Sequence, residues 1–190
     1  MLHGYCPPER FLPYLAWTDI AALPDKANTV IVLPAGSIEQ HGPHLPCAVD
    51  TIIAAGVVGH AMARLPRDIP AYALAPITYG KSVEHLHFPG TVTLEGPTLL
   101  STVTEIGESV YRSGFRKLLI VNGHGGQPQI MEMAARELRL RQEFFLVSAS
   151  LQDMLARHGC TMDEAEGLID IVRRTREAEV ACVLKETDDG

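Results

Sequence analysis

A chain of 190 residues is the size of one compact domain, which buries roughly 70% of the surface that its unfolded form exposes. Its apolar fraction of 46% and charged fraction of 21% are those of an ordinary globular protein. The formal net charge of −7 argues against nucleic-acid binding, and no apolar stretch reaches the roughly 20 residues of a membrane span. We therefore expect a single domain over residues 1–190 with neither a nucleic-acid nor a membrane partner.

Strands alternating with helices are predicted along most of the chain. The predicted helices cover residues 17–23, 51–65, 97–112, 128–142 and 151–157, and the predicted strands cover residues 29–35, 71–77, 117–121 and 144–148. The strands are nearly unbroken apolar runs, which is typical of strands covered on both faces of a parallel sheet. The pattern predicts an α/β fold with a mostly parallel sheet between helices.

The loop after the first predicted strand concentrates polar groups that bind metals. Glu39 and His41 lie two residues apart, so in extended backbone both side chains point to the same side. Asp50 adds a second carboxylate at the end of this loop, and carboxylates with neutral imidazoles suit divalent metals. Simpler roles stay open: Asp50 as the N-cap of the helix over residues 51–65, Glu39 as a capping or ion-pairing residue, and His41 as a core histidine.

A glycine-rich turn follows the third predicted strand and contains His124 in the stretch Asn122-Gly123-His124-Gly125-Gly126. Such a turn alone often only holds a phosphate, but its spacing matches no nucleotide-binding fingerprint. Its position is more informative, because parallel α/β sheets bind ligands at the carboxyl ends of their strands. We therefore expect four side chains to converge there: Glu39, His41, Asp50 and His124.

Residues 37–46 (SIEQHGPHLP), with Asp50 nine residues after His41, resemble the signature of the creatininase (creatinine amidohydrolase) family. Residues 88–91 (FPGT) and 122–126 (NGHGG) match that family too, in the same order. The resemblance covers about residues 11–155. It implies a three-layer α/β/α fold, two divalent metal ions (Zn or Mn) with a bridging water, hydrolysis of an amide-type C–N bond, and a homo-oligomer such as a hexamer.

The resemblance also implies roles for individual residues. Asp50 would bridge the two metals, Glu39 and His124 would complete the shell of one, and His41 would bind the other. Asp50, Glu39 and His124 are accordingly the expected catalytic residues. Ser82 and His87 lie where family members contact substrate, although as sequence features they are ordinary loop residues.

The C-terminal part departs from the family pattern. Gly126 stands where creatinine-hydrolysing members place a metal-binding Glu, whereas Glu179 falls on a Glu that other members use instead. Arg174 replaces the family's proton-shuttling His, and an Arg stays protonated near neutral pH. Residues 163–184 also fit an ordinary amphipathic helix. We therefore expect Glu179 as a metal ligand, in a tail that is divergent or truncated from about residue 160.

The sequence thus predicts a metal-dependent amidohydrolase whose partner is a small-molecule amide, such as a cyclic amide, a formamide or a small peptide-like amide. The alternative, motivated by Arg174, is a catalytically impaired metal-binding or assembly protein of the same fold. Four scattered cysteines without a Cys-x-x-Cys pair, and an N-terminus without a signal pattern, favour a cytoplasmic location.

Overall fold

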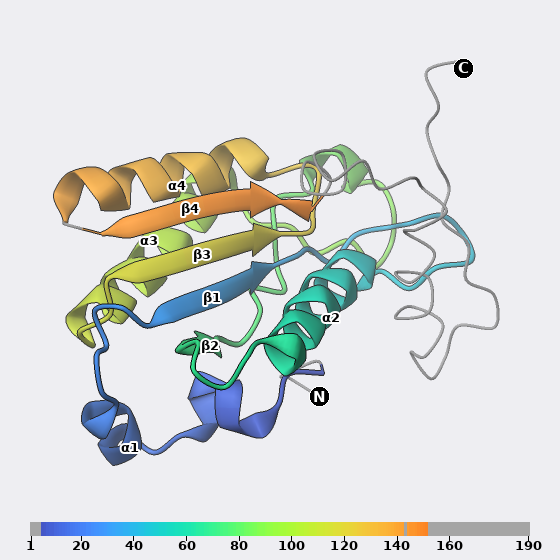
Figure 1. The fold of residues 1–190 in the computed structure, drawn as a ribbon. Helices are drawn as coiled ribbons and strands as arrows, with labels where there is room; N and C mark the ends of the chain where they lie inside the picture. The colour runs from blue at the N-terminus through green and yellow to red at the C-terminus, as the bar shows by residue number, and fades with distance from the viewer. Residues whose placement is uncertain (1–4, 143, 152–190) are drawn as a thin grey trace, which may run out of the picture.

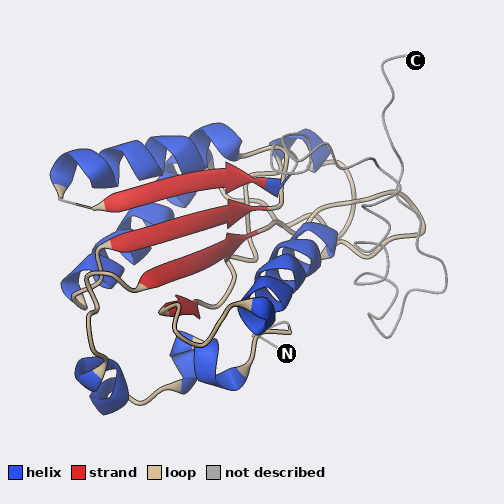
Figure 2. Ribbon diagram, in the orientation of Figure 1, coloured by secondary structure: helices blue, strands red, loops and turns tan. Residues whose placement is uncertain are grey.

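A four-stranded parallel sheet forms the centre of the fold in the computed structural model, which describes residues 5–142 and 144–151 (Figure 1). The strand order is β2-β1-β3-β4, and all three strand pairs are parallel, as the arrows in Figure 2 show. The strands are β1 (Val30–Ala35), β2 (Ala71–Ala73), β3 (Lys117–Asn122) and β4 (Phe145–Ser150). The predicted parallel sheet is confirmed.

Helices cover the sheet on both sides (Figure 1). Helix α2 packs on one face, and helices α3 and α4 pack on the other and against each other. The α-helices are α1 (Trp17–Ala22), α2 (Val49–Arg64), α3 (Gly96–Arg112) and α4 (Pro128–Arg141), and the 3-10 helices are η1 (Pro8–Arg10), η2 (Leu12–Tyr14) and η3 (Val83–His85). The three-layer α/β/α arrangement is therefore confirmed.

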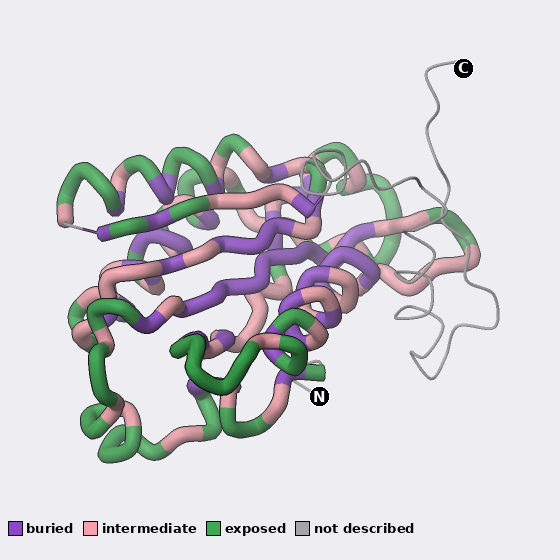
Figure 3. Tube along the Cα trace, viewed as in Figure 1, coloured by how far each residue is buried: buried purple, intermediate pink, exposed green. Residues whose placement is uncertain are grey.

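The burial of strand β1 on both faces of the sheet explains why its sequence is an unbroken apolar run. Ile31 and Leu33 face the core beneath α3 and α4, whereas Val32 faces the second core beneath α2. All three side chains are buried, and Figure 3 shows the buried middle of the sheet. Since successive side chains of a strand point to opposite faces, a strand covered twice needs apolar residues at every position.

The order of the strands places a potential ligand-binding position at the carboxyl ends of β1 and β3. The chain leaves β1 through α2 to reach β2 on one side, and then returns through α3 to β3 on the other side of β1. The loops that follow these two adjacent strands therefore diverge at their carboxyl ends. Open α/β sheets bind ligands at such a switch point.

Strand β2 is shorter than the predicted range of residues 71–77. The chain beyond Ala73 still follows β1, because Leu74 and Ile77 donate their N–H groups to the carbonyls of Val32 and Pro34 over 2.8 and 2.9 Å. Pro76 has no N–H to donate, so the ladder is interrupted there. The prediction of a regular strand to residue 77 was therefore wrong in its length.

Several predictions concern residues outside the described ranges. These are the helix expected after Leu151, the amphipathic alternative over residues 163–184, and the positions of Arg174 and Glu179. The prediction of one domain over residues 1–190, with a divergent tail from about residue 160, also extends outside the described ranges. Among the described residues, no helix is both long enough and apolar enough to cross a bilayer.

Candidate metal centre

The candidate site forms where the loop after β1 lies against the first turn of α2. Gly36 makes this close approach possible, because a Cβ there would lie 2.4 Å from the Cα of Thr51. The Thr51 hydroxyl also donates a hydrogen bond to the carbonyl of Ser37 over 3.0 Å. The packing brings Asp50 next to the residues that follow β1.

Asp50 is not the N-cap of α2, which corrects one of the simpler roles left open by the sequence. The helix begins at Val49 with Ala48 as its N-cap, and no side-chain capping hydrogen bond is formed. The Asp50 side chain, 10% exposed, is turned away from the helix end toward two imidazoles. Its carboxylate is therefore available to the site and does not cap the helix.

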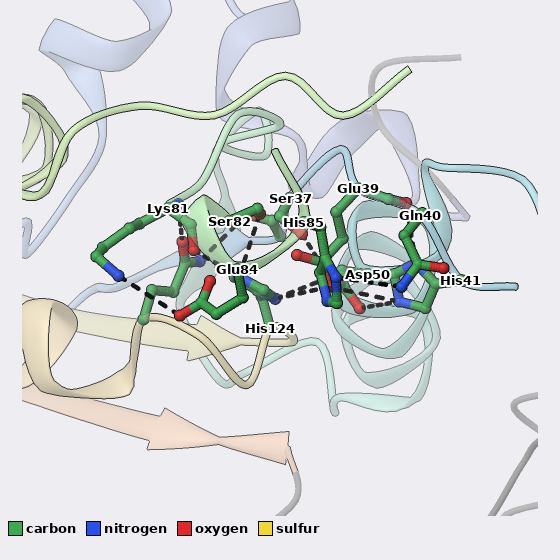
Figure 4. A network of polar contacts seen from close by, with 12 residues as sticks. Ser37, Glu39, Gln40, His41, Asp50, Lys81, Ser82, Glu84, His85 and His124 are labelled. Atoms are coloured by element: carbon green, nitrogen blue, oxygen red, sulfur yellow. Dashed lines mark hydrogen bonds and ion pairs between the residues drawn. The ribbon is translucent and has the colours of Figure 1, made fainter. Parts of the chain in front are cut away.

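Each carboxylate oxygen of Asp50 faces a different imidazole (Figure 4). Oδ1 lies 3.0 Å from Nε2 of His41, and Oδ2 lies 3.0 Å from Nδ1 of His124. The hydroxyl of Ser37 donates a further hydrogen bond to Oδ2. Asp50 is thus at the centre of the cluster, with one oxygen directed to each side.

Glu39 supplies the second carboxylate. Its Oε1 lies 3.4 Å from Nδ1 of His124 and 3.9 Å from Nε2 of His41. Its Oε2 is buried and has no hydrogen-bond partner among the described residues. A buried carboxylate oxygen without a partner is costly, and a bound cation would remove that cost.

The two imidazoles are held so that a lone pair of each faces the carboxylates. Nδ1 of His41 lies 3.1 Å from the carbonyl of Glu39, and Nε2 of His124 lies 2.8 Å from the carbonyl of Lys81. A carbonyl only accepts, so these outward nitrogens carry the hydrogens. In a neutral ring the inward nitrogen is then an acceptor, which is the form that binds a metal.

Acceptors facing acceptors repel each other unless a proton or a metal ion lies between them. Burial lowers the pKa of His41 and His124, but the contacts with Asp50 outweigh burial, so that the pKa of both imidazoles is raised. Burial alone would raise the pKa of Asp50. Its hydrogen bonds with His124 and His41 have the larger combined effect, so that the pKa of this carboxyl is lowered overall. The cluster therefore favours positive charge at its centre.

The donor set fits a divalent metal. One potential ligand atom each from Glu39, His41 and Asp50 lies within 4.8 Å of the others, and His124 approaches the opposite oxygen of Asp50. Two carboxylates and two imidazoles are ligands that both zinc and manganese accept. The structure therefore brings together the four residues that the sequence placed in one site.

Two further predicted site residues, Ser82 and His87, lie within the described ranges. Ser82 is fully buried, and its hydroxyl lies 3.4 Å from Nε2 of His124, on the side of the ring away from Asp50. His87 is exposed, and its ring is tilted by 41° against that of Phe88, with centroids 4.2 Å apart. Among the described residues, no hydrogen bond or ion pair joins His87 to the cluster. Glu179 lies outside the described residues.

Gln127 holds together the chain segments that carry the cluster, a role that the sequence analysis did not predict. Its side chain is fully buried and donates to the carbonyl of Gly36 over 3.1 Å and to Oδ1 of Asn122 over 3.0 Å. Its own Oε1 accepts the N–H of Lys81 over 3.1 Å. One amide therefore joins three loops, and only its place next to the glycine-rich turn marked it in the sequence.

His85 is a second residue that the sequence analysis missed. Its Nε2 lies 4.0 Å from Oε1 of Glu39, so this histidine faces the cluster whereas His87 does not. The alternation His85-Leu86-His87 did not reveal which imidazole turns inward, because η3 is a single 3-10 turn with no helical or strand periodicity to follow.

Comparison with known protein families matches residues 13–180 to the model of creatininase, described as creatinine amidohydrolase. The mycofactocin precursor peptide peptidase of Mycolicibacterium smegmatis is 38% identical over 135 residues, covering 70% of this chain and 54% of that protein. The creatinine amidohydrolase of Pseudomonas putida is 33% identical over 156 residues, covering 76% of this chain and 58% of that protein. The chain thus spans about half the length of the curated relatives it matches.

Solved structures give the same result. A creatininase structure in a Mn form aligns with a TM-score of 0.67 and 33% identity, over 77% of this chain and 60% of that one. A mutant creatininase of Zn-Zn type aligns with a TM-score of 0.65. Zinc and manganese are therefore the metals named for these neighbours.

Proposed function

Because this chain belongs to the creatininase family, we propose that it hydrolyses an amide-type C–N bond with divalent metal ions held by Glu39, His41, Asp50 and His124. The observation that carries this proposal is the orientation of the two imidazoles. Both outward N–H groups are used by backbone carbonyls, so that both inward lone pairs face the carboxylates. The buried Oε2 of Glu39, which has no hydrogen-bond partner within the described part of the chain, supports it independently.

The side chains divide the work within this proposal. Asp50 offers one oxygen toward His41 and one toward His124, which suits a carboxylate shared by two ions. Glu39 adds negative charge beside His124, and the carbonyl of Lys81 fixes the His124 tautomer. Divalent ions bound there would supply a water of lowered pKa and would polarise the substrate carbonyl. Neither a serine nor a cysteine nucleophile is needed.

The proposed substrate is a small amide: a cyclic amide, a formamide or a peptide-like amide. The absence of a side chain at Gly126 removes the Glu that creatinine-hydrolysing members carry there, which argues against creatinine itself. The 38% identity to a peptide peptidase makes short peptide amides the first compounds to try. Gly125 leaves open space, since a Cβ there would meet nothing within 4 Å.

Metal analysis and amide hydrolysis by the full chain test the proposal together. We expect at least one Zn²⁺ or Mn²⁺ bound per chain after metal loading. We also expect hydrolysis of one class in a panel of short peptides, formamides, cyclic amides and creatinine, detected by mass spectrometry as the addition of one water across the C–N bond. Less than one bound ion per chain under metal-replete conditions would refute the metal site. A chelator should remove the activity, and added metal should restore it.

A second candidate function is favoured by Arg174, which stands where the family uses a proton-shuttling histidine. In that case the chain binds metal but does not turn over substrate. The variant Arg174→His separates the two candidates: activity in the unmodified chain removes the second, whereas activity only after the substitution supports it. Assembly into a homo-oligomer and a cytoplasmic location remain predictions, which light scattering and cell fractionation can check.

A further inference from the structure

The side-chain amide of Gln40 has a defined orientation. Its Oε1 accepts the N–H of Gly42 over 2.9 Å, so the amide nitrogen points the other way. That nitrogen lies 3.2 Å from Nδ1 of His85. An amide nitrogen only donates, and therefore Nδ1 of His85 must be the acceptor in this hydrogen bond.

This hydrogen bond fixes the tautomer of His85. When Nδ1 accepts, the single hydrogen of the neutral imidazole is on Nε2. Nε2 is the nitrogen that lies 4.0 Å from Oε1 of Glu39. An N–H dipole therefore points toward a carboxylate that the proposed function assigns to the metal. Figure 4 shows the side chains of Gln40, His85 and Glu39.

We infer that His85, oriented by Gln40, is a positioning residue that holds the carboxylate of Glu39 for metal binding. This inference rests on the proposed function, in which Glu39 is a ligand. His85 is not itself a ligand in this arrangement, because its inward nitrogen carries the hydrogen. It differs in this respect from His41 and His124, whose inward nitrogens carry lone pairs.

The loop that carries His85 is anchored to the segment that carries Glu39. The N–H of Gln40 donates to the Thr91 hydroxyl over 3.3 Å, and the N–H of Val92 donates to the carbonyl of Ile38 over 2.9 Å. The His85 ring also meets the edge of Phe88, with centroids 6.1 Å apart. The His85 imidazole is therefore held in place by the fold before any metal binds.

Replacing His85 should lower the metal affinity only moderately. Removing a partner of a metal ligand typically costs 10- to 100-fold in metal affinity. The distance of 4.0 Å exceeds a hydrogen bond by about 1 Å, so the contact is a weaker electrostatic one until the Glu39 side chain moves. We therefore expect the lower end of that range, a loss of about tenfold.

The first measurement uses the unmodified chain without metal. Long-range ¹H–¹⁵N spectra of the histidine side chains at about pH 8, where a neutral imidazole dominates for an ordinary histidine, identify which ring nitrogen carries the hydrogen. We expect the Nε2–H tautomer for His85. The Nδ1–H tautomer would overturn the inference, because the N–H would then face Gln40 and not Glu39.

The second measurement is Zn²⁺ affinity, determined by competition with a chelator, for His85→Phe and His85→Gln. The Phe variant keeps a ring beside Phe88 but has no N–H, whereas the Gln variant returns an amide donor. His60→Phe is the matched control, since His60 belongs to α2 and its ring stacks on that of Tyr5, at 4.9 Å between centroids. Circular dichroism verifies that all the variants are folded.

We expect His85→Phe to bind Zn²⁺ about tenfold more weakly than the control, and His85→Gln to recover part of the loss. Equal affinities for His85→Phe and His60→Phe would overturn the inference. If the unmodified chain binds no Zn²⁺, the proposed function fails, and the tautomer measurement alone decides whether the Gln40–His85 pair is oriented as inferred.

Discussion

The carboxylate of Asp50 lies 3.0 Å from Nδ1 of His124, although Asp50 belongs to the first turn of α2 and His124 follows β3. The sheet creates this pair, because β1 and β3 are neighbours and both end at the same edge. The same carboxylate also contacts His41 through its other oxygen. Asp50 is thus the residue on which both halves of the cluster depend.

Asp50→Asn should lose metal binding more severely than any other single change in the cluster. The amide removes the negative charge and turns one oxygen into a donor that faces an imidazole. We expect a loss of Zn²⁺ affinity larger than the 10- to 100-fold that is typical of an outer partner. Isothermal titration measures it, with Asp68→Asn as a control because Asp68 is exposed and lies outside the cluster. An affinity within a factor of ten of the parent would contradict the bridging role.

The metal-free protein should become less stable as the pH rises above about 6.5, the ordinary pKa of histidine. The pKa of His41 and of His124 is raised in the folded state, mainly by contact with Asp50 against the opposing effect of burial. The folded state therefore binds more protons than the unfolded state in this range. Stability from these contacts is complete below the unfolded pKa and is lost as the pH rises through the folded pKa, by at most about 1.4 kcal/mol per pH unit for each proton.

Asp50 acts at the other end of the pH range. Its pKa is lowered in the folded state, so its contribution is present above the ordinary Asp pKa of about 3.9 and is lost at lower pH. Urea unfolding of chelator-treated protein from about pH 2 to 9 covers both ranges. Zn²⁺ competes with the protons, so its affinity should rise over the range in which the metal-free protein loses stability. A metal-free stability that increases from about pH 6.5 to 8 would contradict the assigned proton positions.

The sequence was sufficient for the parallel sheet between helices and for the convergence of the four central side chains, for identifiable reasons. Apolar runs such as residues 29–35 mark strands covered on both faces, and parallel strands bring their following loops to one edge. Glu39, His41 and His124 then converge without any knowledge of side-chain contacts. The end of β2 at Ala73 was missed, because the pattern alone does not show where Pro76 interrupts the ladder.

What the sequence could not supply depends on long-range contacts. The packing of the loop after β1 decides whether Asp50 caps the N-terminus of α2 or faces an imidazole. This packing requires the close contact of Gly36 with Thr51. The choice between His85 and His87 is likewise made by a hydrogen bond with Gln40, 45 positions away. No local periodicity reports such contacts.

Gly126→Ala should damage the site, whereas Gly125→Ala should not. A Cβ at Gly126 would lie 2.6 Å from Nε2 of His124 and 2.9 Å from the carbonyl of Lys81, the two atoms whose hydrogen bond fixes the His124 tautomer. A Cβ at Gly125 would meet nothing within 4 Å. We expect Gly126→Ala to cost about 1–3 kcal/mol of stability and about tenfold in Zn²⁺ affinity.

Thermal unfolding and chelator competition on the two alanine variants make this comparison at neighbouring positions. Similar losses in both variants would show that the turn, and not the contact with His124, is sensitive. The contact also gives a physical reason for glycine at this position, because a side chain there would displace His124.

Gln127→Ala should destabilise the whole fold by about 3 kcal/mol, because it leaves a cavity and removes three hydrogen bonds in the interior. These bonds hold Gly36 after β1, Asn122 at the end of β3 and Lys81 before η3. Gln129→Ala is the matched control, since Gln129 is the same residue type and is exposed in the first turn of α4. Urea unfolding gives both free energies, and a difference below about 1 kcal/mol would contradict the joining role. Since the carbonyl of Lys81 also fixes the His124 tautomer, Zn²⁺ affinity should fall in Gln127→Ala even where the variant remains folded.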